Sequence, residues 1–377
     1  MPIYNTGKKK DGRTQYRVVV SYTDPLGKYK KVERTAYGNA EAKEIELVLL
    51  KEVGENTLSK RITVNDLIEE YMADKKQNVR LHSYETTLYA LEHTVIPSLG
   101  NIKLDKLSPP VLQKWKTDLG ESDMTVCSKK YYFQNFSSLL NYAVRLGYLP
   151  QNPLKKIGNF REVEFKKPED IQYYTAEEFL RYQAAAREFA EKASPKKRYK
   201  EWAIYVFFNI AFYTGMRRGE INALTWGNVQ DNIIKVRQAV TVNKGGNYVV
   251  GDPKTPSSVR DIIIPEPLAD ILKEHKDRQS TDPRFTEDYL VCGGITFLSN
   301  DALSARHKKY YTAADLKHIR IHDFRHTHAT LLINNGINIM EICRRLGHRD
   351  IKITLERYSH LYPQEEQKAL SILNEIK

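Results

Sequence analysis

The segment from Ala203 to Tyr213 constrains the fold most strongly, because its residues are apolar on nearly every side of a helix. Such a helix has to be covered all round, either by the rest of a protein or by lipid. The chain has no uninterrupted apolar run of the ~18 residues that a membrane span needs. We therefore expect this helix at the centre of a soluble domain that is large enough to bury it.

The net charge indicates a polyanionic partner. The 377 residues include 59 Lys and Arg against 47 Asp and Glu, a formal charge of +12, which favours nucleic acid. The N-terminus lacks the apolar stretch of a signal peptide, so we expect a cytoplasmic protein. Cys127, Cys292 and Cys343 have no CxxC spacing, so they predict no disulfide framework and no zinc finger, and we interpret them as small buried residues.

Residues 1–60 predict a small sheet with a helix. Gln15–Tyr22 and Lys28–Thr35 alternate like strands around a turn, and apolar residues recur at helical spacing from Ala40 to Val53. Residues 1–34 contain nine bases and three acids. A basic β-ribbon can lie in a DNA groove, although these residues would also suit a solvated face. The candidate DNA contacts are Lys8, Lys9, Lys10, Arg13, Arg17, Lys28 and Lys30.

The rest of the chain predicts a helical unit followed by a larger mixed unit. Residues 61–160 contain four helix patterns, and the polar stretch Asn159–Pro168 is the candidate linker. Residues 161–377 are mainly helical, with hairpin-like strands between Ile233 and Ile264. Lys192–Lys200 adds five bases and no acid, and we expect it to be an exposed loop. The fold class is thus multidomain and mainly α, with small β-sheets.

Four short segments of the larger unit contain the candidate chemical groups. In the first, Arg217 follows Gly215 at the end of the buried helix, and Glu220 lies one turn later, where it could hold the guanidinium. In the second, Lys254 lies in a turn between strands, where an ammonium could protonate a leaving alkoxide. Both also have ordinary interpretations, as a structural ion pair and a solvated lysine.

The third segment is rich in histidine. His322 and Arg325 are three residues apart and share a helical face. His322 and His326 have the i, i+4 spacing of a zinc site. No carboxylate or cysteine accompanies them at ligand spacing, however, and Arg325 would repel a cation. We interpret His326 and His328 as packed or helix-capping residues.

The fourth segment places a histidine after a helix and a tyrosine beyond it. The apolar stripe in Ile339–Leu346 predicts a helix that ends at Gly347, so His348 emerges at its C-terminus, where a cationic imidazole is favoured. Tyr358 follows on a short helix. The chain has 24 tyrosines, so any one of them is more often a buried ring than a catalytic group.

Together these groups suit attack on a phosphodiester without a metal or any other cofactor. Two guanidinium forks match the negative charges that build up on the non-bridging oxygens. A phenol is a poor nucleophile until it loses its proton, a step that His322 or the arginines could assist. A covalent phosphotyrosine retains the energy of the broken bond, so a strand can be rejoined without ATP. A metal-dependent nuclease would need clustered carboxylates, and the sequence has no such cluster.

At these residues the sequence resembles the tyrosine recombinase (phage integrase) family. TGMRRGEINAL, HDFRHTHATLL, RRLGH and YSH stand in the order of the family's motifs. The resemblance implies that Tyr358 cleaves DNA to a 3′-phosphotyrosine, which the 5′-hydroxyl of a partner strand then attacks. The implied roles are phosphate binding by Arg217 and Arg325, general acid catalysis by Lys254, assistance by His322 and His348, and support of the site by Glu220.

The resemblance covers the whole chain and implies three domains. Residues 1–60 are similar to an arm-type DNA-binding domain, a three-stranded sheet with a helix, found in phage and conjugative-transposon integrases. Residues 61–160 resemble a helical core-binding domain, and 161–377 a mixed α/β catalytic domain. The implied partner is double-stranded DNA with core and arm sites, bound by a homotetramer that integrates or excises a mobile element through a Holliday junction. An excisionase or a host DNA-bending protein is a further expected partner.

Three other functions stay open at this point. A type IB topoisomerase has the same catalytic set, but the arm-like domain and the short C-terminal tail argue against it. A DNA-binding regulator without catalysis is an alternative from another class. A zinc hydrolase is the most distant of the three.

Overall fold

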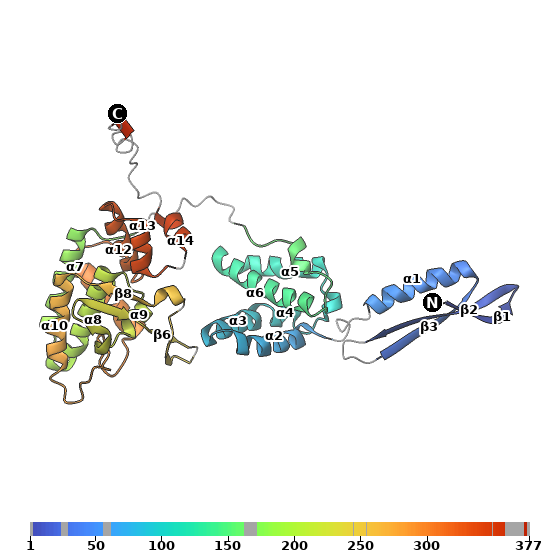
Figure 1. Ribbon diagram of the computed structural model, residues 1–377, viewed down its shortest axis with the longest axis horizontal. Coiled ribbons are helices and arrows are strands. Elements are labelled where there is room, and N and C mark those ends of the chain that lie inside the picture. Colours follow the sequence, from blue (N-terminus) through green and yellow to red (C-terminus); the bar gives the residue numbers. More distant parts are fainter. Residues whose placement is uncertain are drawn as a thin grey trace. The chain divides into compact units, whose positions relative to one another are not determined.

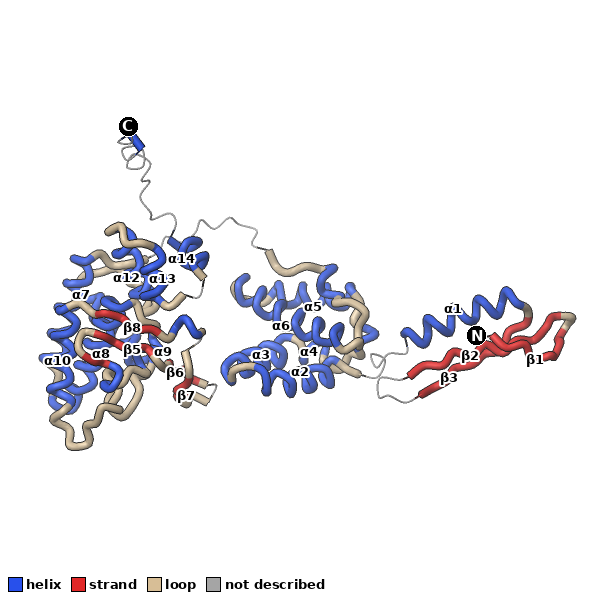
Figure 2. Tube along the Cα trace, viewed as in Figure 1, coloured by secondary structure: helices blue, strands red, loops and turns tan. Residues whose placement is uncertain are grey.

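The computed structural model describes residues 3–23, 29–55, 62–161, 172–243, 245–253, 255–348, 350–358 and 373–374. The chain divides into two compact units, residues 1–165 and 166–377. Figure 1 shows their elements in chain order, and Figure 2 shows which are helices and which are strands. The predicted multidomain, mainly helical fold with small sheets is confirmed.

The first unit begins with an antiparallel sheet of three strands in the order β1-β2-β3. These are β1 (Ile3–Lys10), β2 (Arg13–Thr23) and β3 (Tyr29–Tyr37), and α1 (Asn39–Glu55) lies along the sheet (Figure 1). Alternate residues of β2, Val18 and Val20, are buried together with Leu49 of α1. The strand period of two thus gives the sheet one apolar face, which the helix covers.

The first unit continues with a helical bundle that has its own hydrophobic core. Thr63 caps the first helix in a capping box with Asp66, and Pro109 opens another helix directly after Ser108. The helix that begins at Leu81 ends at Thr94, and Pro97 falls in a separate short helix. The helices are α2 (Val64–Asn78), α3 (Leu81–Thr94), α4 (Ile96–Leu99), α5 (Pro109–Glu121) and α6 (Val126–Arg145).

The second unit is a mixture of helices and two small sheets. One sheet has the strand order β4-β5-β8 and the other pairs β6 with β7. The strands are β4 (Val229–Gln230), β5 (Ile233–Val236), β6 (Ala239–Val242), β7 (Tyr248–Gly251) and β8 (Arg260–Ile263). The helices are α7 (Ala176–Glu191), α8 (Pro195–Thr214), α9 (Arg218–Asn222), α10 (Glu266–Gln279), α11 (Asn300–Ala313), α12 (Asp323–Asn334), α13 (Ile339–Leu346) and α14 (Ile351–Tyr358).

Helix α8 is the predicted buried helix, and its burial is confirmed. Helices α7, α10 and α12 pack against it, and Phe207 and Phe208 are almost wholly buried. The expected loop at Lys192–Lys200 is wrong in part, because α8 begins at Pro195 and includes the bases that follow it. Pro at the first helical position fixes φ without losing a needed N–H, so the helix can start inside this basic stretch.

Two further observations concern the predicted cysteines and the membrane. Cys292 and Cys343 are buried as expected, but Cys127 is exposed near the start of α6. None of the helices in the described part of the chain is long and apolar enough to cross a bilayer.

Candidate active site

The C-terminus of α8 is fixed by a close contact that only glycine allows. Gly215 has a left-handed φ of +63°, and a Cβ there would lie 2.8 Å from Leu346 Cδ2 and 2.9 Å from His328 Cδ2. The Gly215 carbonyl accepts a hydrogen bond from Arg325 Nη1 at 2.8 Å. The buried helix therefore ends at a defined point beside α12 and α13, and Arg217 follows immediately.

Glu220 joins Arg217 to a second arginine, Arg260. Arg217 Nη1 donates to Glu220 Oε1 at 2.8 Å, and Arg260 Nη2 donates to Glu220 Oε2 at 2.9 Å. The Glu220 side chain is 2% exposed and that of Arg217 is 32% exposed, so Arg217 alone of this pair reaches the surface. Burial favours the neutral acid, but the charges and hydrogen bonds of Arg260 and Arg217 outweigh it and hold the pKa of Glu220 below its ordinary value.

Arg260 was not among the predicted site residues. It shares the buried face of β8 with Ile262, and its side chain is 5% exposed. Its Nε donates to the Arg345 carbonyl at 2.6 Å and its Nη1 donates to the Ser258 carbonyl at 2.9 Å. Arg260 occupies one of the alternate positions of the strand that are buried, like Ile262. A buried arginine is rare unless it is paired, so this position in the sequence could have indicated a buried ion pair.

Arg217 and Arg325 converge on consecutive carbonyls at the end of α13. Arg325 Nη2 donates to the Leu346 carbonyl at 2.7 Å, and Arg217 Nη2 donates to the Gly347 carbonyl at 3.4 Å. Gly347 has a left-handed φ of +66° and ends the helix as predicted, and His348 is the next residue. Three of the six candidate catalytic residues thus belong to elements that meet at one point.

The site concentrates positive charge. Burial, followed by the charge of Arg217, lowers the pKa of Arg325 to about 9, whereas Glu220 and Tyr358 act in the opposite direction. Arg325 therefore stays cationic at neutral pH. Two cationic guanidinium groups in one place are unfavourable in the free protein and become favourable when a phosphate lies between them.

Tyr358 points its hydroxyl towards α12. Its side chain is 1% exposed, and its ring belongs to an apolar cluster with residues of α12 and α13. Its Oη shares a hydrogen bond with Nδ1 of His326. His326 is packed as expected, at 6% exposure, and it also contacts the hydroxyl of the candidate nucleophile. Local spacing along α12 did not reveal this contact, since Tyr358 lies on another helix.

The other two histidines of α12 differ from His326. His322 lies at the N-cap position, and its ring is perpendicular to that of His326 with 5.3 Å between the centroids. His328 is buried, and its Nδ1–H donates to the Phe212 carbonyl at 2.9 Å. Burial, helped by the charge of Arg345, lowers the pKa of His328 to about 3, so this residue is neutral and packed as expected.

The candidate general acid, Lys254, lies outside the described residues, and so does Lys28 of the arm-type set. The residues just after Lys254 are described. Thr255 Oγ1 and Ser258 Oγ are 3.0 Å apart, and Ser258 Oγ accepts from Arg217 Nη1 at 3.4 Å. The segment that follows Lys254 in the chain is thereby connected to Arg217.

The basic residues of the N-terminal sheet do not all share one face. Lys10 pairs with Arg13, and Arg17 is an even number of residues further along β2. These three therefore lie on the face opposite the buried Val18 and Val20, that is, away from α1. Lys9 and Lys30 pair with Thr14 and Tyr22, which belong to the helix-facing side, and Lys8 has no direct partner in the β1–β2 register.

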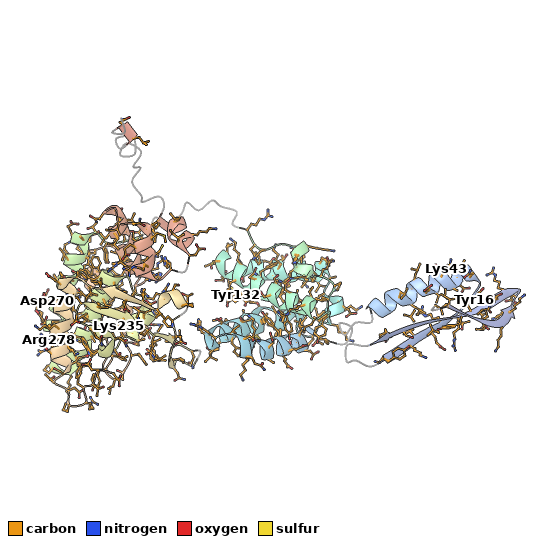
Figure 3. All side chains as sticks on the ribbon, viewed as in Figure 1. Tyr16, Lys43, Tyr132, Lys235, Asp270 and Arg278 are labelled. Carbon is orange, nitrogen blue, oxygen red and sulfur yellow. The ribbon has the colours of Figure 1, made fainter. Side chains whose placement is uncertain are left out.

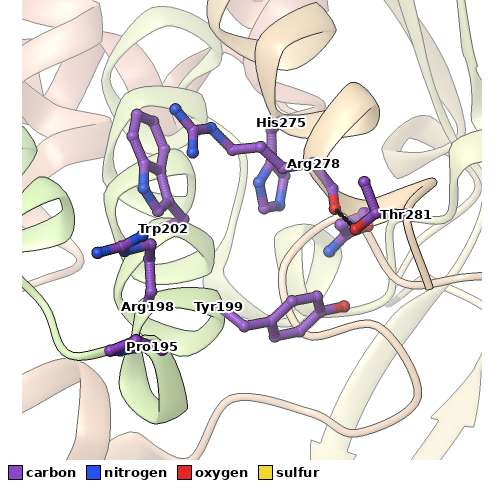
Figure 4. A pocket seen from close by; sticks show the side chains of 8 residues that line it. Pro195, Arg198, Tyr199, Trp202, His275, Arg278 and Thr281 are labelled. Carbon is purple, nitrogen blue, oxygen red and sulfur yellow. Dashed lines mark hydrogen bonds between the residues drawn. The ribbon is translucent and has the colours of Figure 1, made fainter.

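A pocket lies elsewhere in the second unit, between the start of α8 and the end of α10 (Figure 4). The Arg278 guanidinium lies 4.0 Å from the centre of the Trp202 ring, and His275 and Arg198 also line the pocket. None of the described candidate catalytic residues is part of its lining. Among the residues that the structure describes, no three His, Cys, Asp or Glu side chains gather as metal ligands would.

Two family models match this chain. Residues 185–365 match the model of the phage integrase family, and residues 63–120 match the N-terminal SAM-like domain of phage integrases. The two matched segments together cover more than half of the chain. The first includes all six candidate catalytic residues, and the second lies within the helical bundle of the first unit.

Two known relatives match over almost their full length, and a third matches over about two thirds of its length. The chain is 26% identical to the ICEBs1 integrase of Bacillus subtilis, over 98% of this chain and 99% of the relative. It is 28% identical to a XerC-like tyrosine recombinase of Caldanaerobacter subterraneus, over 98% of each chain. The integrase of Mycobacterium phage L5 is 25% identical over 70% of this chain and 67% of its own length.

Solved structures share the fold. The integrase of the transposon Tn1549, in a complex with transposon end DNA, has a TM-score of 0.62 at 20% identity and covers 84% of this chain and 99% of its own. The lambda integrase tetramer on a Holliday junction has a TM-score of 0.55 at 16% identity, over 93% of this chain and 96% of its own. Sequence motifs, family models and fold agree, and the chain belongs to the tyrosine recombinase (phage integrase) family, whose members are site-specific DNA recombinases.

Proposed function

We propose that this recombinase breaks a DNA strand by attack of Tyr358 Oη on the scissile phosphorus, while Arg217 and Arg325 bind the non-bridging oxygens. The observation that carries the proposal is the convergence of the two arginines on the end of α13, in the same part of the unit in which Tyr358 contacts α12. Preorganised guanidinium groups stabilise the charge that develops in the transition state without reorganising at the moment of reaction.

The two chemical steps mirror each other. In the first, the Oη–H bond breaks and a base takes its proton as the Oη–P bond forms; the P–O5′ bond breaks, and Lys254 supplies the proton that the leaving 5′-oxygen needs. In the second, the 5′-hydroxyl of a partner strand gives its proton to Lys254 as it attacks the 3′-phosphotyrosine, and Tyr358 leaves and regains its own proton. His322 and His348 assist proton transfer and phosphate binding. Glu220 holds the guanidinium of Arg217 in position, a role supported by the hydrogen bonds that it accepts from Nη1 and from the main-chain N–H of Arg217.

Each of the three predicted domains has its own proposed role in DNA binding or catalysis. Residues 1–60 bind arm-type sites, residues 61–160 bind core sites together with the catalytic residues 161–377, and the protein acts as a homotetramer through a Holliday junction. The near-complete match to the ICEBs1 integrase supports integration and excision of a mobile element. The tetramer that lambda integrase forms on a Holliday junction supports the assembly. An excisionase or a host DNA-bending protein would set the direction.

The proposal is tested with a suicide substrate, a duplex from the element's attachment region that is nicked close to the cleavage site. We expect a covalent protein–DNA adduct that resists denaturing electrophoresis and is absent from Tyr358→Phe. Tyr310→Phe is the matched control, because Tyr310 is also a buried tyrosine of the second unit but lies in α11. An adduct that persists in Tyr358→Phe would contradict the assignment of the nucleophile.

A further inference from the structure

Helix α12 directs two consecutive side chains to two different partners of the site. Arg325 reaches the ends of α8 and α13 through the carbonyls of Gly215 and Leu346. The next residue, His326, is 6% exposed, and its Nδ1 is hydrogen-bonded to Tyr358 Oη. Two consecutive residues of one helix thus contact two parts of the proposed site. Arg325 belongs to the proposed phosphate-binding pair, and His326 contacts the proposed nucleophile.

The phenol is held in place by its ring. The Tyr358 ring packs with Ala329, Ile333, Ile342 and Leu346, and its hydroxyl is hydrogen-bonded to His326. A buried hydroxyl needs a hydrogen-bond partner, because an unsatisfied one costs free energy. His326 meets that need, and its ring centroid is 5.7 Å from that of Tyr358. This contact fixes the position of the phenol oxygen beside the imidazole.

The chemistry of the contact suits proton transfer. A neutral imidazole with its hydrogen on Nε2 carries a lone pair on Nδ1 and accepts from a hydroxyl. The arginines favour a negative charge on the phenol oxygen, and the charges of Arg325 and Tyr358 act on each other. The phenol can then ionise if a base within hydrogen-bond distance accepts its proton.

We propose that His326 is the general base that accepts the proton of Tyr358 during strand cleavage. The inference rests on the proposed function and assigns to His326 the step for which the family resemblance suggests His322. As the Oη–P bond forms, the Oη–H bond breaks and Nδ1 of His326 takes the proton. The P–O5′ bond breaks, and the 5′-oxygen receives its proton from Lys254. In the rejoining step His326 returns the proton to Tyr358.

The test compares His326→Asn with wild type on two suicide substrates. The Asn Oδ1 can stand in place of Nδ1 and accept the hydrogen bond, but it cannot take up the proton. One substrate has the natural phosphodiester, and the other has sulfur in place of the bridging 5′-oxygen, because a thiolate leaves without a general acid. We expect His326→Asn to form the adduct about 10²–10⁴-fold more slowly on both substrates, whereas Lys254→Ala is slow only on the natural one.

Controls separate this inference from the proposed function and from misfolding. His328→Asn is the matched variant, because His328 is another buried histidine of α12 that hydrogen-bonds a main-chain carbonyl. Thermal unfolding and DNA binding of each variant show whether it folds. A rate for folded His326→Asn within about threefold of wild type overturns the inference and leaves Tyr358 as nucleophile, as does a defect that the sulfur substrate removes. A wild-type protein that forms no adduct overturns the proposed function itself.

Discussion

Arg260 and Glu220 form an ion pair of 2.9 Å in which neither side chain is more than 5% exposed. A buried ion pair contributes little to stability compared with apolar residues of similar volume. Removal of one partner is costly, however, because it leaves the other charge buried and unpaired. The second guanidinium, from Arg217, also binds Glu220, so the carboxylate is the centre of a small network. Arg260 of β8 and Arg217 bind the same carboxylate, so the position of β8 affects the position of the Arg217 guanidinium.

Replacement of Arg260 is therefore expected to harm both stability and cleavage. Arg260→Met should lower the free energy of unfolding by about 3–5 kcal/mol, measured by urea denaturation. Arg237→Met is the matched control, since Arg237 pairs with Asp261 at 2.5 Å on the surface beside the same strand. The control should cost only about 0–1 kcal/mol. Equal losses in the two variants would contradict the importance of the buried network.

Three buried histidines predict a loss of stability in mild acid. Burial lowers the pKa of His275 and His307 to about 4 and that of His328 to about 3, whereas a histidine in an unfolded chain titrates at about 6.5. Between these values the unfolded chain binds more protons than the folded one, so stability rises with pH. The stabilisation is complete above about pH 6.5 and is lost as the pH falls towards 4.

Urea denaturation at a series of pH values between 7.5 and 4.5 measures this effect. The midpoint should fall steadily below about pH 6.5, and His307→Phe should show a shallower dependence because it lacks one of the three groups. A midpoint that stays constant from pH 7.5 to 5 would rule out the predicted linkage.

Gly215 should be far less replaceable than another glycine of similar conformation. Gly215 and Gly147 both have a left-handed φ, of +63° and +77°, but of the two only Gly215 would bring an added Cβ within 4 Å of other atoms, those of Leu346 and His328. Gly147→Ala should cost about 1–2 kcal/mol for the backbone alone, and Gly215→Ala about 1–3 kcal/mol more for overpacking. Thermal unfolding and the adduct assay measure both effects, and similar values for the two variants would contradict the close contact.

The sheet face that carries Lys10, Arg13 and Arg17 is predicted to bind arm-site DNA. Each phosphate contact that is removed should reduce the slope of log K against log salt by about 0.9, so the triple Ala variant should lose up to about 3 in slope. Lys43→Ala is the control, because Lys43 is exposed on α1, and α1 packs on the opposite face next to Tyr16 (Figure 3). Electrophoretic shifts on arm DNA at several salt concentrations make the comparison.

Cleavage of short core sites should be unaffected by the triple variant. If the variant cleaves core sites more slowly but binds arm DNA as well as wild type does, the assignment of the sheet to arm sites is wrong.

The sequence by itself determined the features that depend on neighbours along the chain. An apolar segment predicted the buried α8, and strand alternation followed by a helix pattern predicted the N-terminal sheet with α1. The motifs around Arg217, His322 and Tyr358 indicated the family. All of these signals act over a few residues, through helical or strand periodicity.

Tertiary structure decided which of these residues contact one another. Glu220 and Arg260 are 40 residues apart and His326 and Tyr358 are 32 apart, so no local period relates them. Their contacts depend on the faces with which α9, β8, α12 and α14 pack, and that choice is made by the burial of many apolar side chains at once. His326 shows the difference: its spacing in α12 correctly predicted a packed residue, but only the docking of Tyr358 gives its imidazole a chemical partner.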